Sequence, residues 1–415
     1  MKQLLLIISI IGISTLIFSC KKEKTDNTPG EFKQVNLTEK QQQLINTSNI
    51  FGFEFFKKVN EISGSDANMM VSPLSVSMAL GMTRNGAAGG TLEAMTNTLG
   101  FAGMSDTDIN ESYKYIIETF TGLDPKVKLQ IANSIWYRNT FSVEQPFIVT
   151  NQQYFDASVT PLDFSSPTAV QTINNWVNEK TNKLIPEILD QIPAEAVMYL
   201  VNAVYFKGLW RFQFDKNKTQ QKPFYLVEGT EVQVPSMVQH ESLPYYKGSG
   251  FEAIELPYNQ GNFVMSILLP DADKTVNDII PLLSQENWNS WSTLFSNRDI
   301  QLQLPKFKYA SEEKKMIPIL SDMGMGVAFN PVNADFTRIN SGGDLYISRV
   351  LHKTYIETNE DGSEAAAATV VEISYTSVDP DQPYYFTINR PFIYFIREKS
   401  TGTILFIGTV MNPNL

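Results

Sequence analysis

Hydrophobic residues recur at helical spacing in three parts of the chain, all in its first half. The pattern predicts a helix that opens near Thr38 and runs through Phe56, and a second helix over residues 73–81. The second is apolar or small on most sides, so we expect it to be buried. A third helix is predicted over residues 168–189, where Val170, Ile173, Trp176, Val177 and Leu184 share a face, with Pro186 near its end.

Short apolar or alternating runs follow, and most of them lie in the second half. The predicted strands are residues 127–137, 197–206, 263–269, 300–304, 391–397 and 404–410. Residues 398–402 have the composition of a hairpin turn between the last two. Because helices and strands are segregated and do not alternate, the pattern predicts an α+β fold with large antiparallel sheets.

One segment supports two periodicities. Residues 359–369 read Asn-Glu-Asp-Gly-Ser-Glu-Ala-Ala-Ala-Ala-Thr, and local propensity favours an exposed helix over the alanines. With period two, one face carries Glu364 and Glu372, and every position of the other face is small or apolar: Ser363, Ala365, Ala367, Thr369, Val371 and Ile373. The segment therefore predicts either a loop helix or a strand with one buried face.

The N-terminal segment has the features of an export signal. Lys2 precedes an apolar run over residues 4–18, which is too short and too sparsely flanked for a membrane span. Ser19-Cys20 follows, and a small residue before a cysteine resembles the cleavage site of bacterial lipoproteins. Cys20 is the only cysteine, so a disulfide within one molecule is excluded. The alternative is an ordinary signal followed by a stray cysteine.

We therefore expect three regions. Residues 1–19 are a lipoprotein signal peptide, residues 20–38 are a flexible spacer after a lipidated Cys20, and residues 39–415 form the folded domain. The protein is then exported and anchored to a bacterial membrane, and whether it lies on the periplasmic face or the cell surface stays open.

Composition narrows the classes of function. The chain has 415 residues, is 43% hydrophobic and carries a net charge of −11, so it can bury a large core. It has no basic run longer than a pair such as Lys21-Lys22, which argues against nucleic acid as a partner.

The sequence also lacks the common catalytic patterns. The chain has two histidines, His240 and His352, which do not have the spacing of a metalloprotease helix, and neither a G-x-S-x-G elbow nor a P-loop occurs. Cys20 is used at the anchor, so no catalytic thiol remains. A Ser-His-Asp site built on His352 stays open, although a lone histidine in an apolar strand is more often a hydrogen-bonded core residue. We expect no enzyme activity, no metal and no cofactor.

Several motifs, in order along the chain, resemble the serpin family. They are Asn68-Met-Met-Val-Ser72-Pro-Leu-Ser75, residues 201–210 with Asn202 and Trp210, Glu255-Leu-Pro-Tyr258, Leu304-Pro-Lys-Phe307, residues 347–353 with His352, Asn389-Arg-Pro-Phe392, and residues 406–413. The resemblance extends from about residue 40 to residue 415. It implies one domain with three β-sheets, about nine helices and an exposed reactive-centre loop, and we expect a monomer.

The resemblance also implies roles for single residues. Gly362 and Ser363 resemble the hinge pivot and Glu360 the strand residue before it, and the hinge continues through Glu364, Ala365, Ala366, Ala367, Ala368 and Thr369. Ser72, Ser75, Asn202 and His352 resemble a polar cluster beneath the opening sheet, where they would hydrogen-bond one another. Trp210 resembles the aromatic residue at the point where insertion begins. Plain core packing is the alternative for these five residues, and both roles can coexist.

By resemblance the chain is a protease inhibitor and a suicide substrate. A serine or cysteine protease would cleave the loop, form an acyl-enzyme, and be trapped when the cleaved loop inserts into the central sheet. Counting the hinge length from Glu360 places the cleaved bond at Thr376-Ser377, with Tyr375-Thr376 as runner-up because residues 377–389 are longer than usual. No lysine or arginine lies between Lys353 and Arg390, which favours elastase-, subtilisin- or chymotrypsin-like targets over trypsin.

Two alternatives remain. One is a non-inhibitory serpin that acts as a binding protein; such proteins typically carry bulky, charged or proline residues on the hinge face to be buried, and this hinge carries none there. The other is a lipoprotein hydrolase or a glycan-binding module, which requires a site that the sequence does not reveal.

Overall fold

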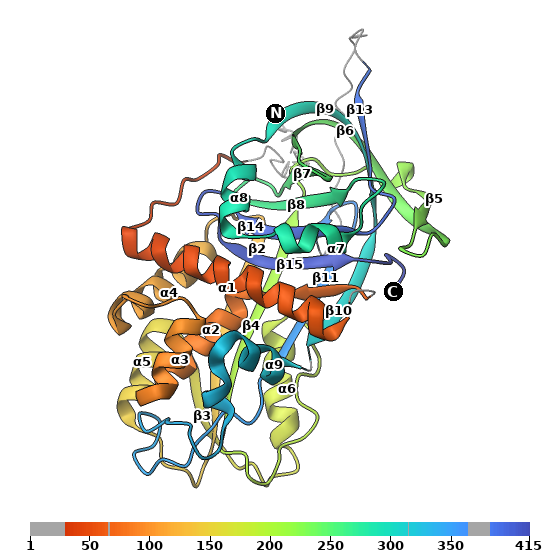
Figure 1. Cartoon of the computed structure of the whole chain (residues 1–415). Helices are drawn as coiled ribbons and strands as arrows, with labels where there is room; N and C mark the ends of the chain where they lie inside the picture. The colour runs from red at the N-terminus through yellow and green to blue at the C-terminus, as the bar shows by residue number, and fades with distance from the viewer. Residues whose placement is uncertain (1–29, 65–66, 314, 364–381) are drawn as a thin grey trace, which may run out of the picture.

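The structure is a computed structural model that describes residues 30–64, 67–313, 315–363 and 382–415. In these ranges two hydrogen-bonded sheets are combined with nine α-helices, most of them packed around one end (Figure 1). The helices are α1 (Glu39–Ser63), α2 (Pro73–Arg84), α3 (Gly89–Thr98), α4 (Asp106–Phe120), α5 (Gln145–Phe155), α6 (Ala169–Lys180), α7 (Val276–Ile279), α8 (Gln285–Ser292) and α9 (Met316–Leu320). Short helical turns are η1 (Lys216–Lys218), η2 (Ile280–Leu282), η3 (Ser321–Met325) and η4 (Gly326–Phe329). The α+β class is confirmed.

The six-stranded sheet contains the hinge segment. Its order is β10 (Phe307–Glu313), β11 (His352–Thr358), β12 (Gly362–Ser363), β4 (Met198–Leu209), β2 (Val127–Arg138) and β3 (Ser158–Leu162). Neighbouring strands are antiparallel except β2 and β3. The two residues of β12 therefore lie between two much longer strands.

The nine-stranded sheet has two parts that share one strand. Its order is β1 (Met69–Val71), β15 (Ile404–Val410), β14 (Phe392–Glu398), β8 (Phe263–Pro270), β7 (Phe251–Pro257), β6 (Glu231–Lys247), β9 (Ser296–Pro305) and β13 (Tyr384–Thr387), and β5 (Gln220–Tyr225) also pairs with β6. Residues 245–247 of β6 pair with β7, whereas residues 236–245 pair with β9. The three expected sheets are present as two because β6 continues from one part into the other.

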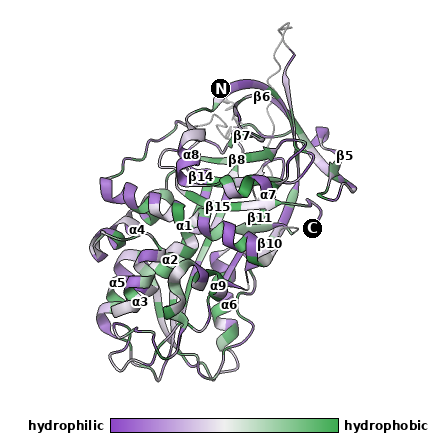
Figure 2. Cartoon of the chain, viewed as in Figure 1, coloured by the Kyte–Doolittle hydropathy of each residue, from purple (hydrophilic) through white to green (hydrophobic). Residues whose placement is uncertain are grey.

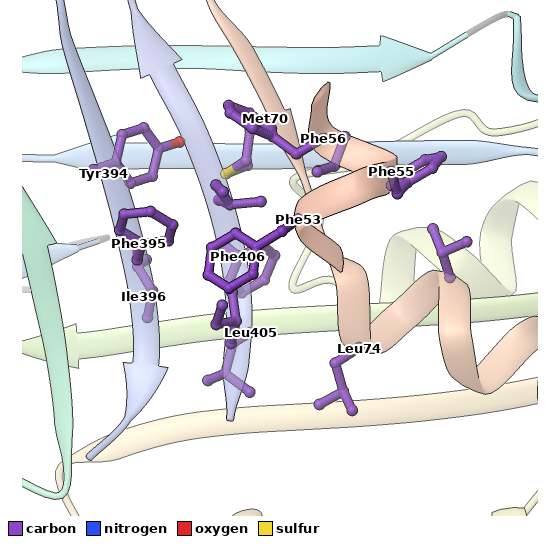
Figure 3. Packing of buried hydrophobic residues seen from close by; sticks show 14 of the residues in the cluster. Phe53, Phe55, Phe56, Met70, Leu74, Tyr394, Phe395, Ile396, Leu405 and Phe406 are labelled. Carbon is purple, nitrogen blue, oxygen red and sulfur yellow. The ribbon is translucent and has the colours of Figure 1, made fainter. Parts of the chain in front are cut away.

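Helix α1 packs on strands β14 and β15 and forms much of the core. It begins at a capping box in which the Thr38 hydroxyl accepts from the Gln41 backbone N–H. Phe53 lies edge-on to Phe395 of β14, with 6.1 Å between ring centroids, and Phe55 and Phe56 are fully buried beside it (Figure 3). Each buried phenylalanine stabilises the fold by about 1.5–3 kcal/mol. Hydrophobic residues accordingly concentrate on the central strands, and the outer helices show mixed faces (Figure 2).

The predicted strands and the first two helices are confirmed, and the third helix is shorter than predicted. It ends at Lys180 and not near residue 186. Asn182 and Lys183 adopt left-handed backbone conformations, with φ of 52° and 67°, which end the helix. The Asn174 side chain then accepts from the backbone N–H groups of Ile188 and Leu189. The buried apolar residues after residue 180 therefore belong to a loop that packs on the core and not to the helix.

The segment before α1 is attached to the body, whereas we expected a flexible spacer up to residue 38. The Asn262 side chain bonds both the N–H and the C=O of Lys33, at 3.1 and 2.6 Å. Val35 is buried, and its N–H donates to Ser400 Oγ. The alternating pattern around Val35 is too short to signal this docking. Within the described ranges, no helix has the length and apolar character that crossing a bilayer requires.

Candidate hinge and strand-insertion site

The candidate site lies at the end of the six-stranded sheet where β12 enters between β11 and β4. Ser363 pairs with Thr358 of β11 on one side and with Gly208 of β4 on the other. The backbone just before it is also fixed, because the Trp210 N–H donates to the Asp361 carbonyl at 2.9 Å and the Phe214 N–H to the Glu360 carbonyl at 3.0 Å. The hinge residues predicted from the resemblance therefore begin a strand inside the sheet.

Gly362 permits a close approach of two backbones. A Cβ added at this position would lie 2.0 Å from the Gly208 carbonyl oxygen, far inside van der Waals contact. Any side chain there would push β12 away from β4. Glycine is therefore required for β12 to enter the sheet.

Ser363 is buried and bound by an aromatic pair. Its hydroxyl lies 2.7 Å from the Tyr258 hydroxyl, and the Tyr258 ring stacks on Trp210 with 4.5 Å between centroids. The Trp210 indole N–H donates to the Asn359 carbonyl at 2.9 Å. Burial raises the pKa of Tyr258, so the phenol stays protonated and can donate. Trp210 thus lies at the start of β12, and its role in insertion stays a prediction. Tyr258 is a contact to which the sequence assigned no role.

Two buried carboxylates at the root of β12 each have a lysine partner. Glu360 accepts from Lys306 Nζ at 2.9 Å and from the Thr219 hydroxyl at 2.7 Å, and Asp361 pairs with Lys216 at 2.7 Å. Burial alone would raise the pKa of Glu360, but the hydrogen bonds from Lys306 and Thr219 lower it below its usual value. These partners lie far away in sequence, and no local pattern signals them.

Below β12, strands β4 and β11 are separated. Among the described residues, the only ladders that link these two strands run through β12. A cavity of about 290 Å³ lies between the start of β4 and residues 344–352, lined by Asn202 and His352 among others. In the part of the chain that the structure describes, the sheet is therefore open along most of this junction.

The predicted polar cluster is divided across this opening. The Ser72 backbone N–H donates to His352 Nε2 at 3.0 Å, and Ser72 Oγ accepts from the Ser75 N–H at 3.3 Å. The Asn202 amide instead donates to Asn133 of β2 at 2.6 Å. The expectation that all four residues hydrogen-bond one another is therefore wrong for Asn202, because β2 and β4 are in register at this pair and β11 is not beside it. Asn133 was not singled out from the sequence.

His352 is a core residue in this structure. Its Nε2 accepts a backbone hydrogen bond, and burial lowers its pKa to about 4. The nearby Ser72 hydroxyl donates to the Leu405 carbonyl and not to the imidazole. The arrangement is therefore not that of a Ser-His pair prepared for nucleophilic attack.

Several predicted residues lie outside the described ranges. They are Cys20, the later hinge residues Glu364, Ala365, Ala366, Ala367, Ala368 and Thr369, and the reactive-bond candidates Tyr375, Thr376 and Ser377. Their roles remain predictions.

Comparison with known proteins identifies the class to which this fold and hinge belong. The family model described as Serpin (serine protease inhibitor) matches residues 46–413. Leukocyte elastase inhibitor A of Rattus norvegicus is 31% identical over 385 residues, which cover 90% of this chain and 100% of that protein. The native structure of tengpin, a thermophilic serpin, superposes with a TM-score of 0.82 at 35% identity, covering 93% of this chain and 97% of tengpin.

The chain belongs to the serpin family. Human thyroxine-binding globulin also matches, with a TM-score of 0.82, 26% identity and coverage of 90% of this chain and 99% of that one. An inhibitor by name and a binding globulin by name thus share the fold. Family membership alone leaves both functions open.

Proposed function

We propose that this serpin inhibits proteases as a suicide substrate, in which β12 is the first part of a strand that is completed after cleavage. The observation that carries the proposal is the entry of Ser363 between β4 and β11 with both pairings made. A segment that continued from Ser363 would run antiparallel to both neighbours. It would convert an open junction into a fully paired one.

The register assigns partners to the rest of the hinge. If the strand continued in the same register, residues 364–373 would pair with residues 207–198 of β4, and residues 364–369 would pair with residues 357–352 of β11. Because Ser363 faces the buried side, residues 365, 367, 369, 371 and 373 would share that side. These are the small or apolar positions of the sequence pattern. Each new ladder bond stabilises the inserted state by about 1 kcal/mol.

The chemistry requires only the protease and the loop. The protease serine oxygen attacks the carbonyl carbon of Thr376, the bond to the Ser377 nitrogen breaks, and the acyl ester forms as that nitrogen takes a proton. Insertion of residues 364–373 then moves the ester, three residues further on, across the molecule before water can cleave it. The serpin acts as a trapped substrate and not as a catalyst.

The direct test is a denaturing gel with a panel of proteases. Elastase-, subtilisin- and chymotrypsin-like proteases should form complexes with the serpin that survive SDS. Trypsin should be trapped poorly, because no basic residue lies in the loop. Mass spectrometry of the released C-terminal fragment locates the cut: a start at Ser377 supports Thr376-Ser377, and a start at Thr376 supports the runner-up. Efficient trapping of trypsin would contradict the proposed position of the loop, and absence of a complex with every protease would favour a binding protein.

We also propose that Cys20 carries the lipid that holds the exported protein at a membrane. The support is the signal-like residues 1–19 and the small residue before a sole cysteine. Cys20→Ser should move the protein from the membrane fraction to the soluble fraction and leave trapping in solution intact. Membrane retention of that variant would count against lipid attachment.

A further inference from the structure

The N-terminal segment is docked next to the hinge. Lys33 bonds Asn262 and Val35 bonds Ser400, so the segment crosses the tips of two adjacent hairpins, β7/β8 and β14/β15. A Cβ on Gly30 would lie against the Gln260 side chain. Gln260 is two residues from Tyr258, which contacts Ser363 of the hinge. The described chain therefore starts at the end of the molecule that carries the insertion site.

Buried polar contacts fix this turn, so it is a firm attachment point. The Asp124 carboxylate, which is buried after α4, accepts from the Asn259 side chain at 2.7 Å and from the Gln260 N–H at 3.0 Å. Asn262 is fully buried. A force or tether acting through residues 30–35 is thus transmitted to the hairpin tips and not to a loose end.

The distance from this point to the anchor is limited by covalent geometry. From Cys20 to Gly30 the chain spans at most about 36 Å even when fully extended. A protease of about 230 residues has a diameter of roughly 45 Å. A lipid on Cys20 therefore keeps this end of the serpin within less than one protease diameter of the bilayer.

The side chains around the docked segment suit a membrane surface. Phe32 is 44% exposed and lies between the docked residues Gly30 and Lys33. Lys33, Arg211 and Lys399 are exposed cations around the same turn, since Arg211 bonds the Gln260 carbonyl and the Lys399 N–H bonds the Asn262 carbonyl. The Lys399 ammonium also pairs with the buried Glu255 carboxylate at 3.3 Å, so Lys33 and Arg211 are the main candidates for lipid contact. Glu31 is the acidic side chain of the segment. An exposed aromatic ring with several cations is the composition that favours an anionic lipid interface.

We propose that the hinge-bearing end, formed by residues 30–35, the turn at residues 258–262 and the hairpin at residues 398–402, faces the anionic lipid bilayer. This orientation rests on the proposed lipid at Cys20. It holds β12, where the hinge begins, near the membrane, so a target protease confined to the same surface would be met at high effective concentration. The opposite end, with α3, α5 and residues 330–341, points away from the membrane (Figure 1).

The orientation can be measured by energy transfer to the bilayer. Because Cys20 is the only native cysteine and is blocked by its lipid, a second cysteine can be labelled selectively. Tyr385→Cys places a dye on β13 at the hinge-bearing end, and Val332→Cys places one at the far end; both side chains are exposed, at 64% and 86%. The lipidated proteins are reconstituted into vesicles of phosphatidylethanolamine and phosphatidylglycerol that contain an acceptor lipid.

We expect transfer from position 385 to exceed that from position 332 by roughly twofold or more, and the difference to shrink when phosphatidylcholine replaces the anionic lipid. The double variant Phe32→Ser, Lys33→Gln should also reduce the difference, since neither side chain is used in the docking. Equal transfer from the two positions would overturn the orientation alone. Loss of both labelled proteins from the vesicles would overturn the lipid anchor and the orientation with it.

Discussion

The two long junctions of β4 are built differently. On one side β4 is paired with β2 along the whole stretch from Val127 to Tyr137, and on the other side the two residues of β12 provide its link to β11. The first junction is fully paired in the intact chain by the residues of β2. The second begins with the two residues of β12 and, on the proposed mechanism, would be completed by the rest of the hinge after cleavage.

Cleavage of the loop should have the largest effect on the difference between the two junctions. If residues 364–373 complete the second junction, about ten new ladder bonds at about 1 kcal/mol each should raise the melting temperature by roughly 10–15 °C. Limited proteolysis followed by calorimetry measures the shift. A nick in an ordinary surface loop leaves the melting temperature unchanged or lowers it, and that result would remove the basis of the inhibitory mechanism.

Ser363→Arg should keep the second junction open. Ser363 is 3% exposed and its hydroxyl contacts Tyr258, so an arginine there would be buried without a partner. Insertion should slow relative to deacylation, so the number of serpin molecules consumed per protease trapped should rise by about tenfold. The stoichiometry of inhibition by an elastase-like protease measures this.

Glu364→Arg is the matched control for that variant. By the period of a strand, an inserted residue 364 would face the opposite side from Ser363, so the same introduced arginine should leave trapping close to that of the unmodified protein. Equal loss in both variants would show that the face assignment is wrong.

Acid should lower the free energy of unfolding through His352, which lies beside the open junction, and this effect should be smaller than that of loop cleavage. His352 lines the cavity, and burial lowers its pKa from 6.5 to about 4 in the folded protein. Between these values the unfolded chain binds the proton and the folded chain does not, so this contribution is full above pH 6.5 and is lost as the pH falls to 4. The loss is on the order of 3 kcal/mol.

The measurement is the denaturant midpoint between pH 7.5 and 4. In His352→Gln the loss of unfolding free energy between pH 6.5 and pH 4 should be smaller by the contribution of this histidine. His240→Gln, at an exposed position, should behave like the unmodified chain. An unchanged slope in His352→Gln would mean that the imidazole is hydrated in solution.

Local sequence patterns were sufficient to predict helices and strands whose formation depends on the spacing of neighbouring hydrophobic residues. The helical spacing that begins near Thr38 and the apolar runs at residues 263–269 and 404–410 were sufficient to place α1, β8 and β15. The third helix was extended too far because its last apolar residues are buried from a loop, and apolar spacing does not distinguish these two cases. The docking of residues 30–35 depends on Asn262, which is more than 200 residues away.

The candidate site was predicted in part for the same reason. Gly362, Ser363 and Trp210 lie together as the resemblance implies. Lys306, Lys216 and Tyr258 were not assigned to the hinge, since their contacts with it arise only when distant strands meet. Asn202 was assigned to the wrong partners because the sequence does not reveal which junction of the sheet is open.

The two residues of β12 have a consequence for the speed of the proposed mechanism. Starting a new strand normally requires a slow nucleation step, in which the backbone is ordered before most contacts form. Ser363 is already in register with both neighbours, so insertion would begin as propagation. A slip of one residue would turn the charged face of the hinge inward, and the fixed start excludes that slip. Insertion would thus start from a correctly aligned strand, which favours it in its competition with hydrolysis of the acyl ester.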